Sequence, residues 1–233
     1  MSYIEIITYI AVVAICISGV IAAYTKRINL MGCILIGSIT AFGGGTIRDI
    51  LLDRYPIYWI VDGQWLLITT CVTIFTIIFI PIFKLKSMKY SIELFDALGM
   101  VIFAITGSYI AHDLGHYNIA ICAVMGTITG IVGGLLRDII CDRVPLVLRS
   151  ELYLLPSFLT GLIYMTLIDY FDFYPLIDQL IAISIGFTIR ILALTFGIKL
   201  SSDIFRKPFI KSKVKTIRKI NIMRKRKIRR SKI

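Results

Sequence analysis

The sequence has few charged residues before its last 35 positions. Residues 1–198 hold 11 lysines and arginines and 13 acids, whereas residues 199–233 hold 15 basic residues and one acid. The net charge of +12 therefore belongs to the C-terminal tail, and the rest of the chain is slightly acidic. This distribution argues against a nucleic-acid-binding protein, which needs basic residues across its binding surface.

Residue patterns typical of metal centres and catalytic sites are also missing. The five cysteines stand singly, without a CxxC pair, and the two histidines, His112 and His116, share one short connection. GxSxG, HExxH and phosphate-loop motifs do not occur. We therefore expect no metal, no cofactor and no enzymatic activity. The cysteines are interpreted as packing residues and the histidines as part of a solvated loop.

Long apolar runs make up most of the chain. The sequence is 58% hydrophobic with a mean hydropathy of +0.85, values that are unusual for a water-exposed domain. Runs of about 20 apolar residues match the hydrocarbon core of a bilayer, where unpaired backbone groups favour helices over open sheets. The short alternating segments of a membrane β-barrel are not found. We predict seven transmembrane helices at residues 4–24, 30–52, 65–83, 93–112, 117–140, 151–171 and 175–197.

Basic residues in the short connections predict the orientation in the membrane. They follow the first, third and fifth predicted helices: Lys26, Arg27, Lys84, Lys86, Lys89, Arg143 and Arg149. The alternate connections are mainly acidic, and positive residues collect on the cytoplasmic side. We therefore expect the N-terminus outside and the C-terminus in the cytoplasm. The basic tail is expected to attract the anionic headgroups of membrane lipids.

An internal repeat covers the first six predicted helices. Residues 37–56 read GSITAFGGGTIRDILLDRYP and residues 126–145 read GTITGIVGGLLRDIICDRVP, with eleven identities in twenty positions. The same offset of 89 residues places the first predicted helix on the fourth. Because one unit has three helices, an odd number, the second copy enters the membrane from the opposite side. Inverted repeats of this kind are found in transport proteins.

The repeat divides the chain into consecutive parts. The stretch 4–112 holds the first repeat, with helices 1–3 at 4–83, and the start of the second, whose first helix is at 93–112. The second repeat as a whole covers 93–171, the seventh helix 175–197 and the basic cytoplasmic tail 199–233.

Glycines mark the same place in both repeats. Gly43, Gly44 and Gly45 fall in the second predicted helix, and Gly133 and Gly134 fall in the fifth. We expect these clusters to break the helices, because glycine weakens a helix and freed carbonyls in a membrane line a wet cavity. Close packing of helices through small residues is the alternative.

An arginine–aspartate pair follows each glycine cluster, Arg48–Asp49 in the first repeat and Arg137–Asp138 in the second. Ionisable residues within a span are costly and usually face the protein interior or water. We expect two charged vestibules on either side of a central glycine constriction. Adjacent helix residues point in different directions, so each charge is expected to pair with another helix. Snorkelling to the headgroups is the alternative.

Two further charges fall inside predicted helices. Asp96 lies near the start of the helix at 93–112, where it suits either the helix dipole or a vestibule lining. Arg190 lies in the seventh predicted helix, about two turns from its inner end, and there we expect it to snorkel toward the surface.

The doubled G-G-x-x-R-D-I-x-x-D-R-x-P element at 44–56 and 133–145, with DALGMVIFAITG between the copies, resembles a known family. It is similar to the bacterial branch of the trimeric intracellular cation (TRIC) channels, also labelled UPF0126 or glycine transporter domain. The resemblance covers about residues 4–197. It implies homotrimers with one ion path per protomer, lined by helices kinked at the glycines, and passive transport of K⁺ and Na⁺. Val132 departs from the pattern, because it stands where the first repeat has Gly43.

The sequence thus predicts an all-α polytopic membrane protein that forms a trimeric monovalent cation channel in a bacterial inner membrane. The expected pore residues are Gly43, Gly44, Gly45, Arg48, Asp49, Gly133, Gly134, Arg137 and Asp138. Secondary transport of a small zwitterion such as glycine suits the inverted repeats equally well. A non-conducting scaffold that assembles through small-residue helix faces is a third hypothesis.

Overall fold

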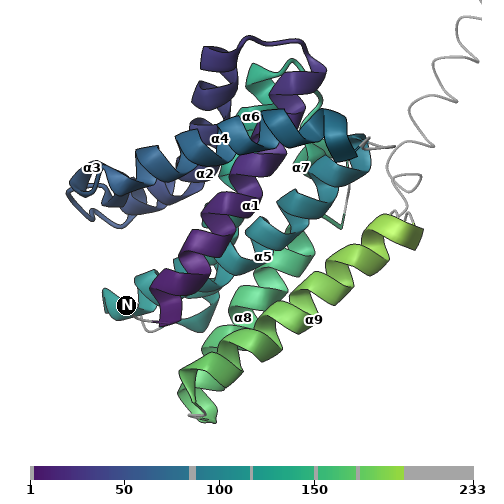
Figure 1. Ribbon diagram of the computed structural model, residues 1–233. Helices are drawn as coiled ribbons and strands as arrows, with labels where there is room; N and C mark the ends of the chain where they lie inside the picture. Colours follow the sequence, from purple (N-terminus) through teal and green to yellow (C-terminus); the bar gives the residue numbers. More distant parts are fainter. Residues whose placement is uncertain (1–2, 84–87, 116–117, 150–151, 172–173, 197–233) are drawn as a thin grey trace, which may run out of the picture. The chain divides into compact units, whose positions relative to one another are not determined.

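The computed structural model describes residues 3–83, 88–115, 118–149, 152–171 and 174–196, and every element in this part of the chain is an α-helix (Figure 1). Seven helices are long: α1 (Tyr3–Thr25), α2 (Leu30–Leu51), α4 (Gln64–Phe83), α5 (Met88–Asp113), α6 (Ile119–Ile140), α8 (Leu154–Tyr170) and α9 (Pro175–Phe196). Two short helices, α3 (Tyr58–Val61) and α7 (Leu146–Arg149), have four residues each. The predicted all-α class is confirmed.

Five of the long helices, α1, α2, α5, α6 and α9, are long and apolar enough to cross a membrane. Shorter apolar stretches occur in α4 and α8, at Gln64–Ile80 and Leu154–Tyr170. The chain divides into two units, Met1–Ile198 and Lys199–Ile233. The predicted basic tail at 199–233 lies outside the described residues.

The start of α5 is the largest difference from the predicted boundaries. The helix begins at Met88, five residues before the predicted start at 93. Lys89 was assigned to a connection, but it lies in the first turn, with its Nζ 3.9 Å from the Glu93 Oε1 one turn further on. Such a pair extends a helix beyond its apolar run. Asp96 therefore lies in the third turn, and the helix-dipole interpretation of this residue is wrong.

The two repeats use the same local structure at the ends of α2 and α6. Asn29 caps α2 by accepting a hydrogen bond from the Gly32 N–H at 2.8 Å, and Asn118 caps α6 by accepting one from the Ala120 N–H at 3.0 Å. Unpaired N–H groups at a helix start favour asparagine there. After each helix the chain turns through an aspartate with positive φ, 51° at Asp53 and 47° at Asp142.

Small residues let α6 lie close to α5. A Cβ on Gly126 would stand 2.2 Å from the Ala104 carbonyl oxygen, and one on Gly130 would stand 2.5 Å from that of Met100. Backbones approach this closely only through small residues. The last helix, α9, packs against α5 and α8, and Figure 1 shows α8 and α9 running side by side. The helix α5 therefore contacts α6, α8 and α9.

Candidate functional site

The helices α2 and α6 cross at the glycine clusters. A Cβ on Gly44 would stand 1.9 Å from the Thr129 carbonyl oxygen, and one on Gly133 would stand 2.1 Å from the Thr40 carbonyl oxygen. The offset of 89 residues relates Gly44 to Gly133 and Thr40 to Thr129. The contact is therefore reciprocal, as in an interface with two-fold symmetry. We call this contact the α2–α6 crossing.

The expected break in the two helices is wrong. α2 is continuous from Leu30 to Leu51 and α6 from Ile119 to Ile140, and both glycine clusters lie inside these helices. The absence of side chains at the crossing allows two backbones to touch, so the glycines are used for packing. Helical hydrogen bonds compensate for the weak helix propensity of glycine, because in a membrane the backbone has no water to bond instead.

The first arginine–aspartate pair is buried at the end of α2. Arg48 donates from Nε and Nη2 to Asp49 Oδ1, at 2.9 and 2.8 Å. The Arg54 Nη1 lies 3.6 Å from the same oxygen. The other carboxylate oxygen of Asp49 accepts a hydrogen bond at 3.2 Å from the N–H of Tyr58, the first residue of α3. Asp49 thus joins two arginines and the start of a short helix.

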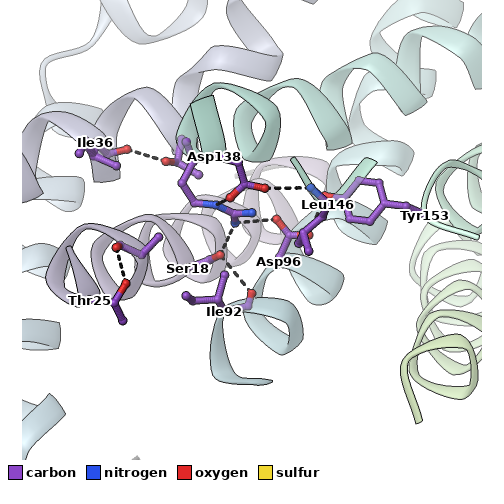
Figure 2. Close-up of polar contacts among 11 residues, drawn as sticks. Ser18, Thr25, Ile36, Ile92, Asp96, Asp138, Leu146 and Tyr153 are labelled. Atoms are coloured by element: carbon purple, nitrogen blue, oxygen red, sulfur yellow. Dashed lines mark hydrogen bonds and ion pairs between the residues drawn. The ribbon is translucent and has the colours of Figure 1, made fainter. Parts of the chain in front are cut away.

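The second pair makes the same arginine–aspartate contact and has two further partners (Figure 2). Arg137 donates from Nε to Asp138 Oδ1 at 2.9 Å, and Asp138 Oδ2 accepts at 3.0 Å from the N–H of Leu146, the first residue of α7. Arg137 Nη1 also donates to Asp96 Oδ1 in α5 at 2.8 Å and to the Ser18 hydroxyl in α1. The second arginine is therefore shared by two carboxylates.

Asp96 has its second oxygen occupied as well. The Tyr153 hydroxyl donates to Asp96 Oδ2 at 2.6 Å. Three elements meet at this carboxylate: α5, which carries it, α6, which carries Arg137, and the segment before α8, which carries Tyr153. Ser18 and Tyr153 were not anticipated, because no motif surrounds either residue and only the fold brings them to Arg137.

The prediction that each charge pairs with another helix holds for Arg137, which bonds to Asp96 of α5, and is wrong for Arg48, which bonds to the adjacent Asp49. Each arginine bonds to the aspartate next to it, and only Arg137 has an additional partner on a distant helix. The rule for adjacent residues concerns directions at Cβ, whereas the guanidinium lies several bonds farther out and can turn toward its neighbour. Snorkelling is also wrong, since Arg48 is 4% exposed and Arg137 0% exposed.

Both short helices follow an aspartate of the motif, and neither was predicted. Asp49 and Asp138 accept from the first N–H groups of α3 and α7, so each carboxylate stabilises the start of the next helix. A four-residue helix has no hydrophobic period to read. The available signal was the repeated aspartate itself, a capping residue placed eight or nine positions before each helix.

Two cavities contain residues of these motifs in their walls. The first, which we call the Arg48 cavity, has a volume of about 220 Å³, and its polar lining comprises Glu5, Thr8, Arg48, Arg54, Tyr58, Thr106, Tyr109 and Asp113. The second, the Asp138 cavity, has a volume of about 90 Å³, and its charged lining comprises Lys89, Glu93, Asp138 and Arg143.

The cavities lie toward opposite ends of α5. The Asp138 cavity reaches Glu93 in the first half of the helix, and the Arg48 cavity begins at Phe103, ten residues further on. At a rise of about 1.5 Å per residue the separation is roughly 15 Å. A route along the helices joins the two cavities. It follows α2 from Arg48 at the first cavity back to Gly44, passes across to α6 and follows α6 to Asp138 at the second cavity. The α2–α6 crossing therefore lies between them.

Two single residues differ from their expected environment. His112 was placed in a solvated loop, but it lies in the last turn of α5, with Nε2 3.5 Å from Asp169 Oδ1 of α8. His116 lies outside the described residues. Arg190 in α9 was expected to snorkel, but it is fully buried with its Cζ 4.6 Å from the centre of the Tyr153 ring.

Comparison with known proteins places both repeats in one family. A family model described as a glycine transporter matches the chain twice, at residues 5–81 and 93–169. The UPF0126 inner membrane protein YadS of Escherichia coli (strain K12) is 31% identical over 187 residues, which are 79% of this chain and 88% of YadS. The UPF0126 membrane protein YvgT of Bacillus subtilis (strain 168) is 34% identical over 161 residues, 68% of this chain and 78% of YvgT.

Solved structures share the fold. One is a TRIC trimeric intracellular cation channel orthologue from Rhodobacter sphaeroides, which matches with a TM-score of 0.80 and 28% identity over 85% of this chain and 100% of that chain. A prokaryotic TRIC channel in 0.5 M KCl matches with a TM-score of 0.77 and 29% identity over 84% of this chain and 98% of that chain. With the apolar helices, the doubled motif and these relatives in agreement, this integral membrane protein belongs to the TRIC/UPF0126 family.

Proposed function

We propose that the protein is a passive channel for the monovalent cations K⁺ and Na⁺, with one path through each protomer of a homotrimer in a bacterial inner membrane. The observation that carries the proposal is the pair of charged cavities on either side of the α2–α6 crossing. Relatives support it, since the solved structures are described as TRIC cation channels, one of them trimeric, and YadS as an inner membrane protein.

The path runs from the Arg48 cavity past the α2–α6 crossing to the Asp138 cavity. Gly44 and Gly133 bring the two backbones into contact, so the crossing is the constriction and must loosen for an ion to pass. The glycines of both clusters and the two arginine–aspartate pairs are then the residues along the path. The pairs keep charge inside the protein without exposing it to lipid.

The charges around the Arg48 cavity favour cations. Arg48 and Arg54 both lie against Asp49, which reduces the positive potential they give to the cavity. Glu5 and Asp113 belong to the same lining. Three acids therefore stand near two arginines, and an acid excess concentrates cations at a pore mouth.

The proposed topology has the N-terminus outside, the C-terminus in the cytoplasm and the repeats inverted, and two contacts support the way it pairs the helix ends on each face. Lys26, after α1, donates to the Asp142 carbonyl at 3.1 Å, so the connections after α1 and α6 lie on one side. His112 at the end of α5 lies beside Asp169 at the end of α8. Both contacts join ends that the charge distribution assigns to the same face of the membrane.

Recording from the purified protein in planar bilayers tests the proposal. Under a KCl gradient we expect discrete current steps that reverse near the K⁺ equilibrium potential, because a channel passes ions one path at a time. Bilayers that received detergent without protein serve as the control. Silent bilayers, with K⁺ flux into liposomes no faster than in empty liposomes, would contradict a channel.

One observation favours a second function, the carriage of a small zwitterion such as glycine. The Arg48 cavity has arginines that suit a carboxylate and acids that suit an ammonium, in about 220 Å³. Repeating the recordings and a radiolabelled glycine uptake assay in the same liposomes separates the two functions. Uptake that saturates with glycine in the absence of ion currents assigns the cavity to a transported substrate.

The acids of the Arg48 cavity provide a test of the path itself. The double variant Glu5→Gln with Asp113→Asn should reduce the K⁺ conductance at 20 mM KCl by about two- to five-fold, because the mouth loses two charges that concentrate cations. At 1 M KCl, where the Debye length is about 3 Å, the difference should vanish. Asp53→Asn, an exposed position outside this lining, should behave as the wild type at both concentrations. Equal loss at both salt concentrations would contradict the electrostatic role.

A further inference from the structure

Arg190 is a buried charge in α9, the helix that follows both segments matched by the family model. Its side chain is 0% exposed. Nη1 donates to the Leu152 carbonyl at 3.4 Å, and the guanidinium lies over the ring of Tyr153. Within the described part of the chain, Nε and Nη2 have no hydrogen-bond partner. An arginine away from water is stable only near compensating negative charge.

A line of contacts leads from Arg190 to the Asp138 cavity. The ring of Tyr153 receives Arg190 at 4.6 Å, and its hydroxyl donates to Asp96 at 2.6 Å. Asp96 accepts from Arg137 at 2.8 Å, and Arg137 donates to Asp138 at 2.9 Å (Figure 2). Asp138 lines the cavity. The charges alternate in sign along this line, with the neutral tyrosine between the first two.

The charges of the buried residues around Tyr153 indicate that Arg190 balances an excess negative charge. Asp96, Arg137 and Asp138 are each less than 5% exposed and together carry one excess negative charge. Arg190 brings the buried group to zero. The contact through Tyr153 is a favourable one, because a phenol that donates to a carboxylate has a more electron-rich ring, and such a ring attracts a cation more strongly.

The arginine–aspartate pair of the first repeat differs from that of the second in its charge balance. The offset of 89 residues places Ile7 at the position of Asp96, so the first repeat has an apolar residue where the second has the carboxylate that binds Arg137. Asp49 is instead shared with Arg54, which is 40% exposed on its side chain and so keeps contact with water. The buried pair Arg48–Asp49 is neutral, so among the buried motif residues only the second repeat has an excess acid that needs a buried counter-charge.

We infer that Arg190 is the counter-charge of the Asp96–Arg137–Asp138 cluster and thereby sets how strongly the Asp138 cavity holds a monovalent cation. The inference rests on the proposed channel function. With Arg190 present, the cluster is neutral and a passing cation is held weakly. Without it, one uncompensated buried negative charge holds the cation longer. Arg190 acts through Tyr153 and Asp96 and is a positioning residue that does not itself contact the ion.

The test is the K⁺ dependence of single-channel conductance in reconstituted Arg190→Gln protein. The half-saturating K⁺ concentration should fall on the order of five-fold, as expected for a unit charge acting over several ångströms of protein. Conductance at high K⁺ should fall too, because a tightly held ion leaves slowly. Arg190→Lys, which keeps the charge, should remain near the wild type. Arg27→Gln removes an exposed arginine and is the matched control.

A second substitution distinguishes the charge from the fold. In Arg190→Gln with Asp96→Asn the buried group is neutral again, so the half-saturating concentration should return to within about two-fold of the wild type. The inference is overturned if the half-saturating concentration stays as low in the double variant as in Arg190→Gln. It is also overturned if Arg190→Gln leaves the half-saturating concentration unchanged.

The coupling between Arg190 and Asp96 is also measurable without ion flow. Melting temperatures in detergent for the two single variants and the double variant form a cycle, and we expect the double variant to be clearly more stable than the sum of the single effects predicts. If the stability changes of the two single variants simply add up in the double variant, the inference that Arg190 is the counter-charge is overturned. If the wild-type protein passes no K⁺, the channel proposal fails on its own, and the cycle still decides whether Arg190 balances Asp96.

Discussion

Gly44→Ala and Gly133→Ala are each expected to lower the free energy of unfolding by about 3 kcal/mol or more. Alanine adds only a Cβ, but that atom would stand 1.9 Å from the Thr129 carbonyl oxygen in one case and 2.1 Å from the Thr40 carbonyl oxygen in the other. Both obstacles are backbone atoms inside helices, so neither can turn aside as a side chain does. Thermal or denaturant unfolding of the purified protein in detergent measures the loss.

The sign of this effect separates two roles of the glycines. If they served only to weaken the helices, alanine would stabilise the protein, since it is better in a helix than glycine by about 1 kcal/mol. The expected clash exceeds that gain. Gly63→Ala is the matched control, because nothing lies within 4 Å of the added Cβ, and it should leave stability almost unchanged. A stabilised Gly44→Ala variant would falsify the close crossing of α2 and α6.

Asp96→Asn is expected to destabilise the protein by about 3 kcal/mol, because it removes one of the two carboxylates that hold a fully buried arginine. The Tyr153 hydroxyl loses its charged acceptor in the same variant, and a hydrogen bond to a charged group contributes more than a neutral one. Asparagine has nearly the shape of aspartate, so the loss reports charge rather than volume. Unfolding in detergent, followed by tryptophan fluorescence, gives the value.

An exposed aspartate provides the comparison for this variant. Asp53→Asn changes the same groups at an exposed turn with positive φ, a conformation that asparagine tolerates well, and should shift stability by less than about 0.5 kcal/mol. Equal effects at the two positions would show that Asp96 is not the partner that stabilises Arg137. A large loss at Asp96 alone supports the shared carboxylate.

Much of the fold was predictable because one physical requirement dominates it. Backbone groups in a lipid environment must bond within a helix, so each long apolar run identifies a helix, and the repeat at an offset of 89 residues relates their equivalent parts. The start of α5 was missed because Lys89 and Glu93 extend the helix beyond its apolar run through their own pair. The short helices α3 and α7 were missed because they begin on hydrogen bonds to Asp49 and Asp138.

The candidate site was predictable in part. The doubled motif identified the glycines and the charged pairs, but their spacing suited both a broken helix and a close crossing. The group that faces Gly44 decides between a broken helix and a close crossing. This group is the Thr129 carbonyl, 85 positions away in the chain. No local pattern contains such a contact. The positions of Tyr153 and Arg190 could not be read from a local pattern either, because both reach the second motif only through packing.

The sequence by itself determined that this chain is helical, spans a membrane and carries two copies of one charged motif, because hydropathy and repetition are properties of neighbouring residues. Only the tertiary structure decided how the charges are balanced. Each arginine turned to its own neighbour, Arg137 acquired Asp96 and Arg190 came to lie over Tyr153, since electrostatic energy in a buried site depends on distances between helices that are far apart in sequence.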